Sequence, residues 1–128
     1  MESIVISVEK EIPKQRIADL LITAFEGGIN YWCEIHGYLP PDFLDFQWDP
    51  DQLYKYVDYP LNDGGFVELF DSQEQKTHGL NITMIRSGLE VMSKKYTKHF
   101  NDFMTENEDA TTGDVFIQCC VFGEVIYG

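Results

Sequence analysis

The last fifteen residues of the chain are its most apolar stretch, and they restrict what the rest can fold into. Only Asp114, Gln118 and Glu124 are polar between positions 114 and 128. Protein must therefore cover nearly every face of this stretch, whether it is a helix or a strand. Its valines and aromatics favour a strand, whereas Thr112 and Asp114 can begin a helix and the run is long for a strand. We expect a buried helix, with a buried strand as the alternative, and Asp114 and Glu124 facing water or at the exposed rim.

A chain of 128 residues fits one domain, so we expect residues 1–128 to share a single core. The content of 44% hydrophobic and 14% aromatic residues argues against intrinsic disorder.

The first third of the chain shows both the alternating apolar pattern of strands and the apolar spacing of helices. Apolar residues alternate from Ser3 to Val8, which predicts a short strand. Helical spacing predicts a helix over residues 13–26, ended by Gly27 and Gly28. Alternation over residues 29–35 favours a strand, with a continued helix kinked at the glycines as the alternative. Residues 36–61 show no helical period, and we expect a long ordered loop with one strand near residues 54–59.

The second half predicts a hairpin followed by helices. Residues 66–70 and 76–80 flank a polar turn, as in a β-hairpin. Asn81 can cap a helix whose apolar face ends near Tyr96, and a shorter helix is expected over residues 97–106. Residues 107–112 are polar and read as a connector. The pattern predicts a small α+β domain, with short antiparallel strands packed against three to four helices and the C-terminal segment buried.

Charge is the strongest indication of function. The chain has 22 acidic residues against 9 basic ones, a net charge of −13. Residues 17–75 hold twelve acids and only one base, Lys55, whereas residues 76–98 hold five bases against Glu90. Such a chain repels nucleic acid and anionic membranes at long range and attracts a basic partner. We therefore expect no direct nucleic-acid binding.

The sequence also gives an expected location. Three cysteines make an odd count, and the N-terminus has no basic region of a signal peptide. No apolar run reaches the roughly 18 residues of a membrane span. We expect a protein of the reducing cytoplasm, with no membrane contact.

No combination of residues indicates metal or covalent chemistry. Cys33 and His36 have the spacing of two zinc ligands, but His78, His99, Cys119 and Cys120 supply no second pair. Cys119 and Cys120 lie in the most apolar segment, where a thiol packs in the core and stays unreactive. We expect no metal, no cofactor and no catalytic residues, and hence no enzyme.

An acidic aromatic segment spans residues 42–51. Carboxylates beside exposed rings suit contacts with guanidinium or ammonium groups, although a solvated loop held by its aromatics is the simpler interpretation. As a partner-binding surface it would use Asp42, Asp45, Phe46, Trp48, Asp49 and Asp51.

The second candidate site follows the first predicted helix. Two glycines let a backbone come close to a ligand, and the residues after them offer hydrogen bonds and a stacking face. The simpler interpretation is a helix end followed by core aromatics. As a ligand pocket it would use Glu26, Gly27, Gly28, Asn30, Tyr31 and Trp32, with Arg86 or the lysines at 94, 95 and 98 meeting a phosphate.

Three segments carry a family resemblance: Glu26–Trp32, the helix Gly88–Met92 leading to Tyr96 and His99-Phe100, and above all Thr112–Gly128. In these segments the chain resembles a group of small acidic proteins encoded by bacteriophages and prophages. The resemblance implies phage origin and an accessory role, often counter-defence, and it implies no catalytic residues.

We therefore expect a binding protein in the infected bacterial host. Its acidic surface would block a basic, nucleic-acid-handling defence protein of the CRISPR or restriction type. The alternative is a sponge that sequesters a nucleotide-like immune signal near residues 26–32. Self-association is also expected, because the C-terminal run has more apolar surface than a small domain easily covers.

Overall fold

The computed structural model describes residues 2–6, 8–39 and 56–128. It shows an α+β domain in which four α-helices accompany a three-stranded antiparallel sheet, as the sequence predicts. The elements in chain order are α1 (Lys14–Thr23), the π-helix η1 (Ala24–Gly28), β1 (Cys33–Leu39), the 3-10 helix η3 (Tyr59–Leu61), β2 (Phe66–Asp71), β3 (Lys76–Leu80), α2 (Ile82–Lys95), α3 (Thr97–Met104) and α4 (Ala110–Phe122).

The sheet has the order β1-β2-β3, and the predicted hairpin is its second pair. Val67, Leu69 and Asp71 on β2 are buried, while the residues between them are half-buried, because successive side chains point to opposite faces. β1 begins at Cys33, later than predicted, because residues 30–32 form a turn after η1. A bulge interrupts its pairing with β2 between Ile35 and Gly37.

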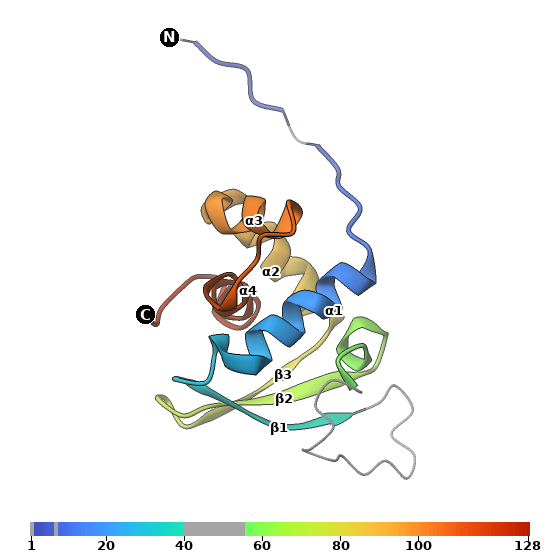
Figure 1. Cartoon of the computed structure of the whole chain (residues 1–128), viewed down its shortest axis with the longest axis vertical. Coiled ribbons are helices and arrows are strands. Elements are labelled where there is room, and N and C mark those ends of the chain that lie inside the picture. The colour runs from blue at the N-terminus through green and yellow to red at the C-terminus, as the bar shows by residue number, and fades with distance from the viewer. Residues whose placement is uncertain (1, 7, 40–55) are drawn as a thin grey trace.

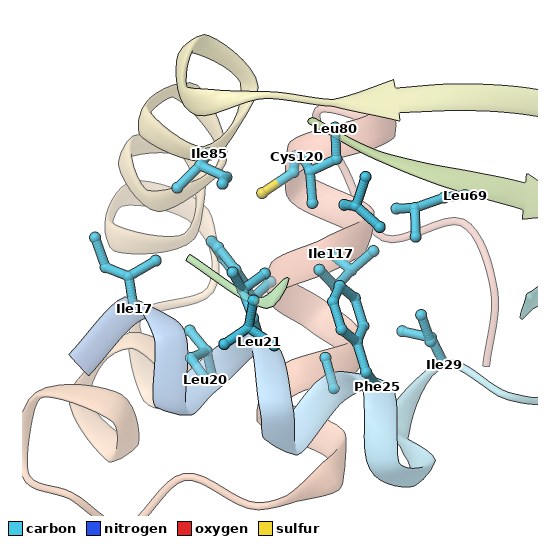
Figure 2. Packing of buried hydrophobic residues seen from close by; sticks show 14 of the residues in the cluster. Ile17, Leu20, Leu21, Phe25, Ile29, Leu69, Leu80, Ile85, Ile117 and Cys120 are labelled. Carbon is cyan, nitrogen blue, oxygen red and sulfur yellow. The ribbon is translucent and has the colours of Figure 1, made fainter. Parts of the chain in front are cut away.

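The helices cover one face of the sheet (Figure 1). Side chains from α1, α2, α4 and two strands converge in one core (Figure 2). Asn81 caps α2 as predicted, since its Oδ1 accepts a hydrogen bond from Met84 N–H at 3.0 Å.

The first part of the apolar C-terminal stretch is a buried helix, as expected, whereas residues 123–128 form no helix and are half-buried or exposed. α4 contacts α1, η1, α2, α3 and β3, and its central residues are buried. α4 begins at a capping box. The Asp109 carboxylate accepts a hydrogen bond from Thr112 N–H, and Thr112 Oγ1 accepts one from Asp109 N–H. The connector predicted over residues 107–112 therefore ends at Asp109. The helix ends at Gly123, whose φ of +73° is readily adopted by glycine.

Close packing around α4 depends on glycines. A Cβ on Gly113 would lie 2.7 Å from the Cα of Ala24 in η1. A Cβ on Gly28 would collide with the carbonyl oxygen of Ala110, and one on Gly88 with the side chain of Cys120. α1 continues into η1 up to Gly28, so the glycine pair ends the helical segment, as predicted, and Gly28 also lets this segment approach α4.

Four sequence predictions need correction. Residues 36–39, expected in the long loop, belong to β1. The described residues between Ser3 and Val8 form no strand, because no other strand lies beside them. Residues 56–59 form turns and 3-10 geometry rather than a strand, while positions 54 and 55 lie outside the described residues. Glu124 is exposed as expected, but Asp114 is half-buried and accepts hydrogen bonds from three side chains.

None of the helices in the described ranges is both long enough and apolar enough to cross a bilayer.

Candidate functional site

The segment after η1 meets α4 and the last residues of the chain at a group of polar side chains. We call this group, formed by Tyr31, Trp32, Asp71, Asp114, Gln118 and Tyr127, the C-terminal junction. Asp114 and Gln118 are four positions apart on α4, which places them on the same side of the helix.

Asp114 joins α4 to the turn before β1. One carboxylate oxygen accepts the Tyr31 hydroxyl at 2.5 Å, and the other accepts Trp32 Nε1–H at 2.8 Å. The same second oxygen accepts Gln118 Nε2–H at 2.9 Å. The carboxylate is thus held by three neutral donors, which orient it and compensate for its partial burial.

Gln118 is fully buried and holds the C-terminal tail, residues 123–128, against the body. Its Oε1 accepts from the N–H groups of Ile126 at 2.8 Å and Tyr127 at 2.9 Å. Its Nε2 lies 3.2 Å from the Tyr127 carbonyl oxygen. One amide side chain therefore acts like a neighbouring strand and satisfies backbone groups that have no strand partner.

Aromatic rings complete the junction. The Trp32 ring lies 5.4 Å from the Phe122 ring and 5.3 Å from the Tyr127 ring, measured between centroids. The Tyr127 hydroxyl donates to Asp71 Oδ2 at 2.8 Å, and the other oxygen of Asp71 accepts from the N–H groups of Gln73 and Glu74 in the hairpin turn. The tail is thus fixed to the sheet as well as to α4.

The junction is suited to holding the chain rather than to proton transfer. Burial, together with the hydrogen bond to Asp114 and its charge, raises the pKa of Tyr31 to about 12. Burial opposes ionisation of Asp71, but hydrogen bonds from Glu74 N–H, the Tyr127 hydroxyl and Gln73 N–H lower its pKa. Tyr31 therefore keeps its proton near neutral pH, and Asp71 lacks one.

The residues of the predicted ligand pocket divide into two sets. Gly28 and Trp32 are buried against other parts of the protein, so they present no open surface to a ligand. Glu26, Gly27 and Asn30 are exposed, and Tyr31 is half exposed with its hydroxyl on Asp114. Arg86 is exposed on a separate helix, α2. Binding of a nucleotide-like signal there stays a prediction.

The predicted partner-binding residues, Asp42, Asp45, Phe46, Trp48, Asp49 and Asp51, all lie outside the described residues.

All three thiols are buried and protonated near neutral pH. Burial raises the pKa of Cys33 to about 12 and that of Cys119 to about 11, and it raises the pKa of Cys120 as well. These thiols therefore lack the thiolate character of a nucleophile. Over residues 2–6, 8–39 and 56–128, no three cysteine, histidine or acidic side chains gather as a metal site.

A depression of about 370 Å³ lies where the segment before α1 passes the end of α3. Its cation, Arg16, already binds Glu108 at 2.7 and 3.1 Å and the Phe103 carbonyl oxygen at 2.6 Å. The hydrogen bond to Glu108 raises the pKa of Arg16 despite its partial burial. Since Glu106 and Asp19 also lie within 4.0 Å, this guanidinium ties α1 to the segment before α4 and offers no charge to an anion.

Sequence reasoning missed the roles of Gln118 and Asp71 and placed Asp114 at the surface. A signal was present in α4, where two polar residues four positions apart interrupt an apolar helix. Polar groups in such a place must find partners. Nothing comparable marks Asp71, whose partner Tyr127 is 56 positions away.

Comparisons with models of protein families, with curated proteins and with solved structures found no match to this chain.

Proposed function

We propose that this protein is a phage-encoded accessory protein that acts by binding a basic, nucleic-acid-handling defence protein of its bacterial host. Its carboxylates would occupy a surface of the partner that normally holds phosphates, as in an inhibitor of a CRISPR effector or a restriction enzyme. One observation supports this most: half of the described carboxylates, nine of eighteen, are exposed and make no ion pair within the described residues.

The described carboxylates differ in their exposure and in their ion pairs. Arg16 neutralises part of the charge of three acids, and Lys76 and Lys98 each pair with one more. Those that are exposed and make no ion pair within the described ranges are Glu2, Glu9, Glu11, Glu26, Asp58, Asp63, Glu90, Asp109 and Glu124. Together with the net charge of −13, they favour attraction to a basic surface.

The polar clusters of the fold also support binding over catalysis. Asp114 and Arg16 are occupied by internal partners, and the three thiols are buried. These groups hold the fold together, so its outer surface is the part available for function.

The proposal can be tested in cells and with purified components. Expression in bacteria that carry CRISPR or restriction systems should restore phage growth, and the protein should co-purify with the affected effector. Affinity should fall steeply between about 0.1 M and 1 M salt, because the Debye length shrinks from about 10 Å to about 3 Å. Affinity that stayed constant over this range would contradict the proposal.

Charge variants make the test specific. Glu26→Gln, Asp58→Asn, Asp63→Asn and Glu90→Gln together remove exposed charges whose side chains make no hydrogen bond or ion pair in the described structure, so the fold should be unaffected. This variant should bind the effector at least tenfold more weakly. In the matched control, Lys94→Gln and Lys95→Gln remove exposed positive charges from α2 and should leave binding intact or stronger.

A further inference from the structure

The N-terminal arm, described at residues 2–6 and 8, holds the four most exposed large apolar side chains of the described chain. Ile4 is 92% exposed, Val5 90%, Ile6 75% and Val8 69%. In Figure 1 the arm runs away from the body as an extended segment, on the side of the helices opposite the sheet. β-branched residues in extended backbone are the usual material of a strand, yet the described residues of this arm pair with none.

The base of the arm is attached to the body. Ile12 packs against the core, and the Lys10 ammonium lies 5.9 Å from the centre of the Phe100 ring. Pro13 then leads into α1 with an extended ψ of 140°. Beyond these contacts the described residues of the arm run away from the molecule's own sheet (Figure 1).

The sheet has an edge that such an arm fits. β3 is an outer strand, and within the described residues its backbone pairs only with β2. Every second residue of β3 therefore directs its N–H and C=O groups outward, which makes this edge a template for another strand. β3 has five residues, and the arm offers a run of similar length from Ser3 to Val8.

Charge favours a second copy of this chain as the molecule whose β3 edge the arm binds. The run from Ser3 to Val8 has no charged side chain, within a chain of net charge −13. A body of the same chain does not repel this segment. Lys76 is exposed at the start of β3, where its ammonium lies 3.9 Å from Glu74, and Glu2 at one end of the arm or Glu9 just after its other end can lie beside it in either strand direction.

We propose that the arm of one copy adds as a strand to β3 of a second copy, and that reciprocal exchange forms a symmetric dimer. Each sheet then gains a fourth strand, and the exchange satisfies the open backbone groups of both the arm and the edge. This inference does not depend on the proposed function.

Sedimentation and hydrogen exchange test the proposal on the full chain. The wild type should convert from monomer to dimer as its concentration rises, and Val5→Pro should raise the dissociation constant at least tenfold, because proline donates no hydrogen bond and disfavours strand pairing. Val5→Thr, which keeps the strand-forming character, should dimerise like the wild type. The arm lies outside the core, so all three proteins should have the same monomer stability.

Three results would overturn the proposal. The first is a wild-type protein that stays monomeric at all concentrations, or one in which the arm amides are already protected from hydrogen exchange in the dilute monomer. The second is a Val5→Pro variant that dimerises as tightly as the wild type. The third is a dimer in which new exchange protection falls outside residues 76–80 and the arm, which would assign the interface to another surface.

Discussion

The two ends of this chain contain similar apolar residues and have opposite environments. In α4, Phe116 and Ile117 are completely buried, and the tail after it is bound to Gln118 and Asp71. In the N-terminal arm, Ile4 and Val5 are at least 90% exposed. The difference lies in the neighbours, because α4 is enclosed by elements of its own chain, whereas the described arm residues have no strand beside them. Hydrophobic character alone therefore does not decide which apolar segment enters the core.

The largest expected effect is the loss of stability when an isoleucine of α4 is replaced by alanine, compared with the same replacement in the arm. Ile117→Ala should lower the free energy of unfolding by about 2–5 kcal/mol, because it leaves a cavity among packed side chains. Ile4→Ala should change it by less than about 0.5 kcal/mol in dilute protein, because Ile4 contacts little. Urea unfolding at low concentration measures both. Equal losses would remove the contrast between the two ends.

A smaller effect is expected from Gln118→Met, which keeps the approximate size of the side chain. The substitution leaves the N–H groups of Ile126 and Tyr127 without their acceptor, and should cost about 1–3 kcal/mol. Gln15→Met serves as the control, since Gln15 is exposed and, among the described residues, bonds only to the nearby Asp19. If the two variants unfolded at the same urea concentration, Gln118 would not hold the tail.

Tyr96→Phe removes a single hydrogen bond that holds the C-terminal tail. The Tyr96 hydroxyl accepts from Val125 N–H at 2.8 Å, and its loss should cost about 0.5–1.5 kcal/mol. The exchange rate of the Val125 amide should rise in this variant, while amides of the arm keep their rates. Unchanged exchange at Val125 would mean that the hydroxyl does not protect it.

The smallest effect is expected from pH. Burial and Asp114 raise the pKa of Tyr31 to about 12 in the folded protein, from an ordinary value of 10.0. The protonated form is thus favoured by folding, so the stability it contributes is complete below pH 10 and is lost as the pH rises towards 12. Solvent screens this half-exposed group, so the decline should be shallow.

Asp114→Asn checks the origin of that pH dependence. Removing the carboxylate charge should lower the pKa of Tyr31, as read from the NMR shift of its labelled ring carbon during an alkaline titration. The decline in stability above pH 10 should become shallower. A Tyr31 pKa that stays near 12 in this variant would assign the shift to burial alone.

Local signals predicted much of the fold. Asn81 and the apolar spacing after it predicted α2, and the polar turn before Lys76 predicted the hairpin. The length of the C-terminal run, and Thr112 and Asp114 as a possible start, favoured a helix there, although α4 begins at Ala110 and ends at Phe122. Each of these depends on residues that are close together in the sequence.

The remainder depends on contacts between distant residues. The alternation from Ser3 to Val8 shows that a strand is possible, but it does not supply a neighbouring strand. Tyr31 and Trp32 reach Asp114 across 83 and 82 positions, so no spacing rule could pair them. For the same reason, the sequence placed Asp114 at the surface. Gln118 lies only eight and nine positions from Ile126 and Tyr127, but the sequence did not show that the helix ends before these two residues.

Amide hydrogen exchange over a dilution series tests the contrast between the two ends most directly. The amides of Ile126 and Tyr127 should be protected to the same extent at every concentration, because their partner Gln118 belongs to the same chain. The amides of the arm should exchange freely in dilute protein and become protected, together with β3, only as the concentration rises. Free exchange at Ile126 and Tyr127, or protection of the arm in dilute monomer, would contradict this explanation.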